Sequence, residues 1–267
     1  MPTYRLTIEY EGTRYHGWQE QKNAKSVTGE LRRAMMEAGA GSVKEIGGSG
    51  RTDAGVHALA QEAHLRLGRA VDPVSFRWAV NDLLPPDIHI LSLVPVPDRF
   101  HARHSAVARS YLYQISRRRS AFAKRWIWWV RRPLDAGLMA DAASYLTGRH
   151  DFHLFCERPA EQPSTVVVVE SIEVVPHGSL ILVRLVASHF LWKMVRRVVG
   201  TLVQVGGGDL DRAGFQGLVD GQVPKGKKGL PAEWTAPPSG LFLERVLYPG
   251  DPPLGPVVPV VPVPSEG

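Results

Sequence analysis

The stretch "TVVVVESIEVVPHGSLILVRLVAS", residues 165–188, decides the fold class of this chain. Two runs rich in valine, isoleucine and leucine lie on either side of His177 and Gly178. Branched apolar residues favour strands, and a glycine between two such runs favours a tight turn. The stretch therefore predicts an antiparallel hairpin, and the class of fold depends on what flanks it.

The hairpin is flanked on both sides by one helix and one strand. Apolar residues at helical spacing predict helices at 136–146 and 192–205, and alternation predicts strands at 110–116 and 241–248. The order is strand, helix, two strands, helix, strand. This βαββαβ order is typical of a ferredoxin-like fold, in which two helices cover one face of an antiparallel sheet.

The first hundred residues repeat the same order. Alternating residues predict strands at 3–10, 59–67 and 88–96, with a short one near Val43, and helices are expected around Leu31 and after Asp72. We therefore expect an α+β fold with ferredoxin-like domains at 1–105 and 106–249. The two halves join into one mostly antiparallel sheet, with the helices on one face and a catalytic cleft between the halves. Residues 250–267, rich in proline and valine, form an extended tail.

The composition limits the partner and the compartment. The 267 residues carry a net charge of +6, which fits a polyanionic partner but does not separate RNA from DNA or an acidic membrane. The single cysteine, Cys156, allows no internal disulfide, and no uncharged apolar run is long enough to span a bilayer. We expect a cytoplasmic protein with no membrane contact.

The loop "GGSGRTDAGVHA", residues 47–58, is the first candidate for chemistry. Four glycines exclude a helix or strand interior and let another molecule approach the backbone closely. The loop also holds Arg51, Thr52, Asp53 and His57, which are more polar groups than a connection needs. An ordinary turn-bracing role for the aspartate is the alternative.

Two further segments supply a cation and aromatic rings. In "FLWKMVRRVVG", residues 190–200, Arg196 or Arg197 could keep a carboxylate ionised, although a solvated basic helix face is the ordinary interpretation. In "RSYLYQI", residues 109–115, Tyr111 and Tyr113 share one strand face. Such rings are usually core residues, but a tyrosine in a cleft offers a stacking surface.

The sequence predicts no metal and no cofactor. Two HxxH pairs, at 101–104 and 150–153, lack a third ligand at a recognised zinc spacing. There is no phosphate-binding GxxxxGK[ST] loop and no GxGxxG fingerprint. Clusters of Lys and Arg in both halves, interleaved with tryptophans, indicate a track for a phosphate backbone; they include 117–119, 124–125, 131–132, and Lys225, Lys227 and Lys228.

Five stretches together resemble the TruA family of tRNA pseudouridine synthases. They are "YHGWQEQ" at 15–21, "GRTDAGVHA" at 50–58, "FHARHSAVARSYLY" at 100–113, "FLWKMVRRVVG" at 190–200 and "GLFLERV" at 240–246. The resemblance runs from Leu6 to Leu247 in the family's order, and "GRTDAGVHA" is highly specific to the family.

The resemblance implies a reaction and roles for individual residues. Asp53 is the nucleophile that starts breaking the uridine N-glycosidic bond, and the uracil turns and is rejoined through C5. Arg196 pairs with Asp53, Tyr111 stacks on the base and helps remove the C5 proton, and Arg51 holds the place of the flipped nucleotide. Thr52, His57, Tyr113 and Leu241 lie in the same stretches and are counted with the substrate-binding residues. Members modify positions 38–40 of the tRNA anticodon stem-loop, use no cofactor and work as homodimers.

Two other functions compete with this interpretation. A non-catalytic RNA-binding module has no need of Asp53 and a matched arginine in the other half. A glycoside hydrolase would need a second carboxylate about 5 to 9.5 Å from the first. No other motif contributes an obvious one.

Overall fold

The computed structural model describes residues 1–157, 164–224 and 229–264. The cluster of Lys225, Lys227 and Lys228 lies outside the described residues. The chain forms two compact units, each described here by itself. Unit 1 comprises Met1–Val107 and Phe242–Asp251, and unit 2 comprises Ala108–Leu241 and Pro252–Gly267.

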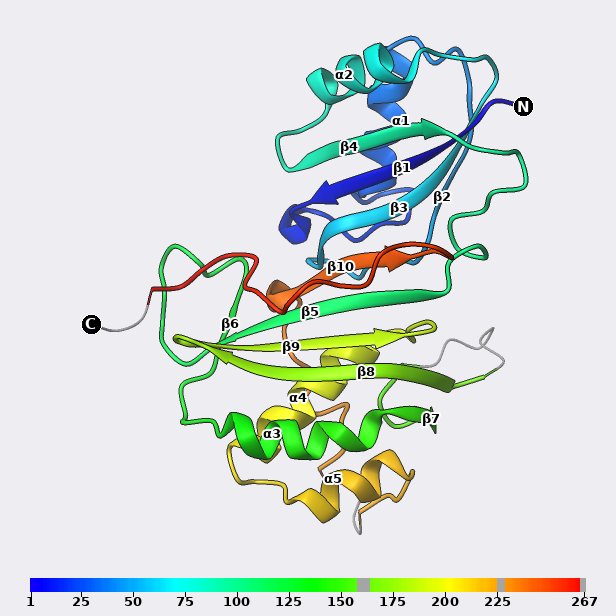
Figure 1. The fold of residues 1–267 in the computed structure, drawn as a ribbon. Coiled ribbons are helices and arrows are strands. Elements are labelled where there is room, and N and C mark those ends of the chain that lie inside the picture. Colours follow the sequence, from blue (N-terminus) through cyan, green and yellow to red (C-terminus); the bar gives the residue numbers. More distant parts are fainter. Residues whose placement is uncertain (158–163, 225–228, 265–267) are drawn as a thin grey trace. The chain divides into compact units, whose positions relative to one another are not determined.

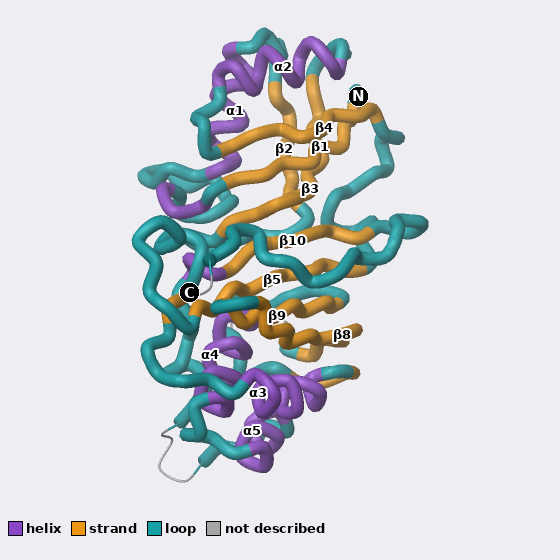
Figure 2. The backbone as a smooth tube through the Cα atoms, turned by 60° about the vertical axis from the view of Figure 1, so that its left-hand side comes forward, coloured by secondary structure: helices purple, strands orange, loops and turns teal. Residues whose placement is uncertain are grey.

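Unit 1 is a sheet with two helices on one face (Figures 1 and 2). Its strands are β1 (Thr3–Tyr10), β2 (Val43–Gly48), β3 (His57–Leu67), β4 (Ile88–Pro95) and most of β10 (Leu241–Leu247). Its helices are α1 (Val27–Glu37) and α2 (Pro73–Leu83). Strand β1 lies between β4 and β3, antiparallel to both, so that Leu6 is opposite Ala63 on one side and Leu93 on the other. Strand β2 pairs antiparallel with β3, and β10 pairs parallel with it.

Capping residues set where the helices of unit 1 begin. The Ser26 hydroxyl accepts a hydrogen bond from the Gly29 amide at the start of α1. The Asp72 carboxylate accepts one from the Ser75 amide, and Pro73 occupies the first turn of α2. Both arrangements satisfy helical N–H groups that have no partner within the helix. The prediction that Asp72 and Pro73 open a helix is confirmed.

Unit 2 is built on the predicted hairpin. Strands β8 (Val166–His177) and β9 (Leu180–Ala187) pair antiparallel, with His177 opposite Leu180 and Gly178 at φ +57° in the turn. Strand β5 (Ala108–Ser116) pairs with β9, β7 (Gly148–Asp151) with β8, and the short β6 (Trp128–Trp129) with β5. The helices are α3 (Ala136–Ala143), α4 (Met194–Gly206) and α5 (Arg212–Val219).

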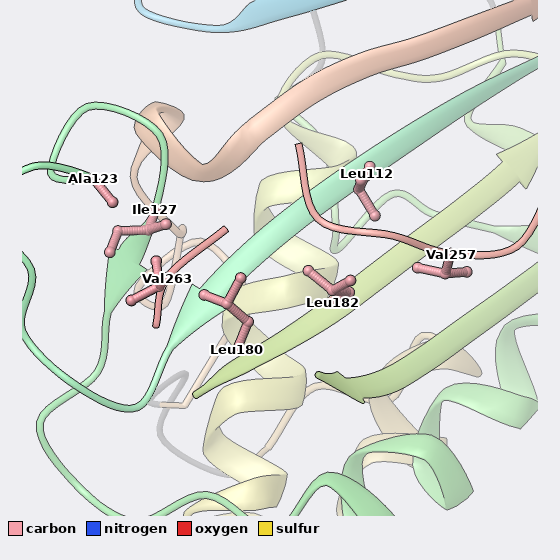
Figure 3. Packing of buried hydrophobic residues seen from close by; sticks show 7 residues of the cluster. All are labelled: Leu112, Ala123, Ile127, Leu180, Leu182, Val257 and Val263. Carbon is pink, nitrogen blue, oxygen red and sulfur yellow. The ribbon is translucent and has the colours of Figure 1, made fainter. Parts of the chain in front are cut away.

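Both faces of β5 and β9 are covered. Figure 3 shows Leu112, Leu180 and Leu182 on the side of the tail valines Val257 and Val263, with α4 behind the strands. Polar contacts fix the tail in the same place: the Val260 amide donates to Gln114 Oε1 at 2.6 Å, and Arg184 Nη1 donates to the Gly255 carbonyl at 2.8 Å. Every residue of β5 and β9 is therefore buried. Residues 257–263 of the tail, which was predicted as an extended segment, pack against this sheet face.

The α+β class and the principal helices and strands are as predicted, but the sequence did not predict strands β6 and β7 or helix α5. Strands β6 and β7 have two and four residues, too few to show a period. Helix α5 contains Gly214 and Gly217, which lower helix propensity. The units also differ from the expected halves, because residues 242–251 belong to unit 1. The reason is the parallel pairing of β10 with β3 and the hydrogen bond from the Tyr248 hydroxyl to the Ala102 carbonyl, 2.8 Å.

Candidate active site

The loop that carries Asp53 joins β2 to β3 in unit 1. Asp53 is partly exposed, Arg51 is exposed and Thr52 is buried. The Val56 amide donates to the Asp53 carbonyl at 3.2 Å, and Gly55 in this turn has φ +77°. A residue with a side chain rarely adopts that conformation, so the turn requires its glycine. The turn leaves Asp53 partly accessible to solvent.

A second segment of unit 1, residues 12–18, holds this loop from one side. The Trp18 amide donates to the Thr52 carbonyl and the Gly55 amide to the Tyr15 carbonyl, both at 3.2 Å. Gly17 has φ +94°, and a Cβ there would lie 2.4 Å from the Thr52 carbonyl oxygen. The loop is thus clamped by backbone hydrogen bonds at the residues on either side of Asp53.

Gly47 and Gly48, expected in a loop, are the last two residues of β2 and allow close internal packing. A Cβ at Gly47 would lie 2.2 Å from the His64 ring, and one at Gly48 would lie 2.6 Å from Trp18 Nε1. Gly50, in contrast, has no atom within 4 Å of such a position. The space beside Gly47 and Gly48 is therefore filled by side chains of the protein itself. The expectation that these two glycines admit another molecule was wrong.

Four buried polar side chains fix the part of the loop that precedes Asp53. The hydroxyls of Tyr10 and Thr52 are hydrogen-bonded at 2.8 Å. The Ser49 hydroxyl donates to Gln61 Oε1 at 2.8 Å, and Gln61 Nε2 donates to the Gly50 carbonyl at 3.1 Å. Burial raises the pKa of Tyr10 to about 12, so its hydroxyl stays protonated at neutral pH. Sequence analysis did not identify this network, although a glutamine on the apolar face of β3 was a signal for it.

His57 also braces the loop. It is 1% exposed, its Nδ1 accepts the Gly12 amide at 2.9 Å, and its ring stacks on Phe242 at 4.8 Å between centroids. An Nδ1 that accepts a hydrogen bond places the proton of the neutral ring on Nε2. These contacts favour a positioning role for His57, and its predicted contact with substrate stays a prediction.

We expect Tyr10→Phe to slow turnover because it removes the partner of the Thr52 hydroxyl beside Asp53. The loss of a buried hydrogen bond should lower the free energy of unfolding by roughly 1–3 kcal/mol. Tyr4→Phe is the matched control: Tyr4 lies on the same strand, and its hydroxyl contacts the carbonyl and amide of Val71. Chemical denaturation and kcat are the measurements. Equal kcat values in the two variants, at equal loss of stability, would show that the network does not position the loop.

In unit 2, helix α4 carries Arg196. Its backbone carbonyl accepts the Ala236 amide at 3.0 Å, and its own Nε donates to the Ala236 carbonyl at 2.7 Å. One turn further, a Cβ at Gly200 would lie 1.6 Å from the Trp234 carbonyl oxygen. The glycine of "FLWKMVRRVVG" therefore lets the segment 234–236 lie directly against α4, and that segment fixes the direction of the guanidinium.

Arg197 points to different partners. Its Nη1 donates to the Cys156 carbonyl, and its Nη2 lies 3.6 Å from Glu157 Oε2. Lys193 Nζ donates to the same carboxylate, and this bond holds the pKa of Glu157 below its usual value. Burial lowers the pKa of Arg197. The two adjacent arginines thus have different partners, since Arg197 belongs to a partly exposed ionic cluster with Glu157 and Lys193.

The two tyrosines of β5 share one strand face, as predicted, but differ in setting. Tyr111 is 9% exposed and meets Phe190 edge to face, at 4.8 Å between centroids. Tyr113 is fully buried, and its hydroxyl donates to the Pro237 carbonyl at 2.7 Å. Burial raises its pKa well above the usual value. Leu241, at the start of β10, is buried as well. These positions favour packing roles for Tyr113 and Leu241 over their predicted contact with substrate.

The predicted site residues are divided between the two units. Asp53, Arg51, Thr52 and His57 share one loop region of unit 1, whereas Tyr111, Tyr113, Arg196 and Leu241 belong to unit 2. The pairing of Asp53 with Arg196 therefore stays a prediction.

One HxxH pair meets further possible ligands. Glu45, His64 and His101 have ligand atoms within 4.8 Å of one another, and the rings of His101 and His104 lie 4.3 Å apart. However, Nδ1 of His64 accepts the Ala102 amide and Nδ1 of His101 accepts the Arg103 amide. Each neutral ring then carries its proton on Nε2, which opposes metal binding there. The fold thus brings further possible ligands to His101 that the sequence did not reveal, namely Glu45 and His64. The hydrogen bonds accepted by the two histidine rings nevertheless do not favour a metal site.

Comparison with known proteins identifies the family of the chain that carries the Asp53 loop and the Arg196 helix. A family model described as tRNA pseudouridine synthase matches residues 6–105 and 142–249. A protein of Beijerinckia indica named tRNA pseudouridine synthase A is 40% identical over 93% of this chain and 95% of its own length. Proteins with the same name from Ruminiclostridium cellulolyticum and Thermoanaerobacter are 39% and 36% identical over 93% of this chain and their full length. A chain in a solved Cbf5–Nop10–Gar1 complex aligns with 75% of this chain over 54% of its own length, at 10% sequence identity and a TM-score of 0.31. This similarity is too low to support any conclusion about fold or function.

The two motifs thus belong to an RNA-modifying isomerase. The chain is a member of the tRNA pseudouridine synthase family, and within it of the group whose members are named tRNA pseudouridine synthase A. Among the described residues, no helix combines the length and apolar character needed to cross a membrane.

Proposed function

We propose that the enzyme converts uridines at positions 38–40 of the tRNA anticodon stem-loop, with Asp53 as nucleophile. The observation that carries the proposal is the clamping of the Asp53 loop: backbone hydrogen bonds from the Trp18 and Gly55 amides hold it while the residue Asp53 stays partly exposed. A nucleophile must be held in a fixed position against its target atom, because a misplaced group loses most of the rate advantage.

The reaction is balanced without any other reagent. The C1′–N1 bond of uridine breaks, the detached uracil turns, and a C1′–C5 bond forms. N1 gains a proton and C5 loses one, so product and substrate have the same composition. No electrons are transferred, and the proposal therefore includes no cofactor.

We further propose that Arg196 pairs with Asp53. A guanidinium keeps a partly buried carboxylate ionised, since desolvation alone would raise its pKa. The support is the fixed direction of the Arg196 side chain on α4, set by its bond to the Ala236 carbonyl. Tyr111 would stack on the extruded base and help to remove the C5 proton, and Arg51 would occupy the place that the flipped nucleotide leaves.

The substrate and the assembly follow from charge and from the relatives. A net charge of +6, with the basic clusters at 117–119, 124–125 and 131–132 in unit 2, fits a phosphate backbone. The relatives carry tRNA in their names. We propose that one tRNA is held by a homodimer in the cytoplasm.

The direct test treats an unmodified tRNA transcript with the purified protein alone and maps pseudouridine by carbodiimide-stop sequencing. We expect stops at positions 38–40 and at no other uridine. Binding of the tRNA without any stop would indicate a non-catalytic RNA-binding module. Release of free uracil would indicate a hydrolase.

A salt titration tests how the RNA is held. Because phosphate contacts release counterions, the log of the association constant should fall with log salt by roughly 0.7–0.9 per phosphate, or near 4–5 for about six contacts. An isolated anticodon stem-loop should bind more weakly with a shallower slope. Filter binding with Asp53→Asn, which prevents turnover, measures both. Equal salt dependence of the association constant for the two RNAs would show that the protein contacts only the stem-loop.

A further inference from the structure

We propose that the segment 117–129 of unit 2 is a binding site for an unpaired nucleobase of RNA, with Phe122 as the stacking surface. The proposal rests on the proposed function in one respect: the RNA is taken to be the tRNA substrate. The segment belongs to unit 2, whereas the Asp53 loop belongs to unit 1.

Charge is the first argument. Residues 117–132 contain seven Lys or Arg, and no Asp or Glu occurs between residues 109 and 134. Arg117, Arg119, Lys124 and Arg125 are exposed. Such a run attracts a polyanion, and phosphate groups are the anions that RNA offers at regular spacing.

The second argument is that the segment is anchored from beneath. Ala123 and Ile127 are buried in the cluster that Figure 3 shows, together with Val263 of the tail. The Trp126 amide donates to the Ala123 carbonyl at 2.9 Å, and the Ala123 amide to the Ser120 hydroxyl at 3.2 Å. Within this fixed turn Phe122 is 94% exposed. An anchored turn that holds an aromatic ring in water loses hydrophobic energy, which a stacking partner would recover.

The third argument is a cavity beside the ring. A cavity of about 340 Å³ is lined by Phe122, Trp126, Arg118, Arg119 and the tail residues Val261, Pro262 and Pro264, among others. Its size lies in the range of small-ligand sites, and its mixture of aromatic, aliphatic and guanidinium groups suits a flat base joined to a phosphate. The Arg119 guanidinium also lies over the Trp129 ring, at 5.7 Å from its centroid.

A second copy of the chain is the less favoured occupant. A symmetric dimer interface brings the same surface of both subunits together. The cationic segment of one subunit would then contact the cationic segment of the other, or residues close to it. Without acidic residues in the segment, such a contact would be repulsive. RNA supplies the complementary charge.

The test uses Phe122→Leu, which keeps an apolar side chain but removes the ring, and Phe122→Tyr, which keeps the ring. Leu138→Ala is the control, since Leu138 is an exposed apolar residue on α3 of the same unit. The probes are a tRNA with 2-aminopurine in its unpaired 3′ end and a fully paired RNA duplex. Binding is followed by 2-aminopurine quenching and by filter binding.

We expect Phe122→Leu to weaken tRNA binding by about fivefold or more, the effect of losing one base–aromatic stack. The duplex should bind it as it binds the wild type, and Phe122→Tyr and Leu138→Ala should match the wild type. Unchanged tRNA binding by Phe122→Leu, or an equal loss for the duplex, would overturn the proposal. A change in sedimentation of Phe122→Leu without RNA would instead identify a protein interface and overturn it too.

Pseudouridine mapping at saturating tRNA separates the two proposals. Phe122→Leu should still modify the tRNA, because the stack contributes binding and not chemistry. If the wild type modifies no uridine, the proposed function fails, whereas ring-dependent quenching at Phe122 would still support a base-binding site.

Discussion

Asp53→Asn should abolish pseudouridine formation while leaving the fold and tRNA binding intact. A neutral amide cannot act as the nucleophile, so the rate should fall by on the order of 10⁴-fold or more, as for other nucleophile deletions. The fold should survive because the loop is held through the backbone groups of Thr52, Asp53 and Gly55 and the Thr52 hydroxyl. Single-turnover mapping, with filter binding as the control, measures the two effects separately. Turnover by Asp53→Asn at the wild-type rate would remove Asp53 from the mechanism.

Arg196→Ala should have the second-largest effect, about 10²–10³-fold on kcat, the range for losing one electrostatic partner of a reacting group. The adjacent Arg197→Ala is the matched control. Arg197 is bonded to the Cys156 carbonyl and lies 3.6 Å from Glu157, so its loss should lower stability while saturated turnover stays close to that of the wild type. Chemical denaturation and kcat of both variants are the measurements. A larger loss of kcat in Arg197→Ala, at matched folded fraction, would assign the catalytic cation to the other arginine.

Local patterns were sufficient to predict most of the fold. The valine-rich hairpin gave β8 and β9, and the Asp72–Pro73 pair gave the start of α2, because strand alternation and helix capping are encoded by neighbouring residues. The position of β10 was harder to predict. Its pairing with β3 joins Phe242 to His57 across 185 residues, and no local period records such a contact.

The candidate site divides in the same way. The Asp53 loop was identified by its unusual composition and by its resemblance to a family. Two of the residues that hold it, Tyr10 on β1 and Gln61 on β3, come from separate strands, and only the fold brings them to the loop. The tail showed the same limit: its prolines excluded helix and central strand, but its packing against Leu112 and Leu182 depends on a sheet that the tail sequence does not describe.

The central claim is that this chain exchanges the N1 bond of a tRNA uridine for a C5 bond. It is tested most directly by tritium release from an unmodified tRNA transcript carrying uridine labelled at C5. The purified protein alone should release one tritium for each pseudouridine formed, with the products mapped to positions 38–40. Incubation that yields free uracil, or that releases no tritium from tRNA bound by folded wild-type protein, would contradict the account.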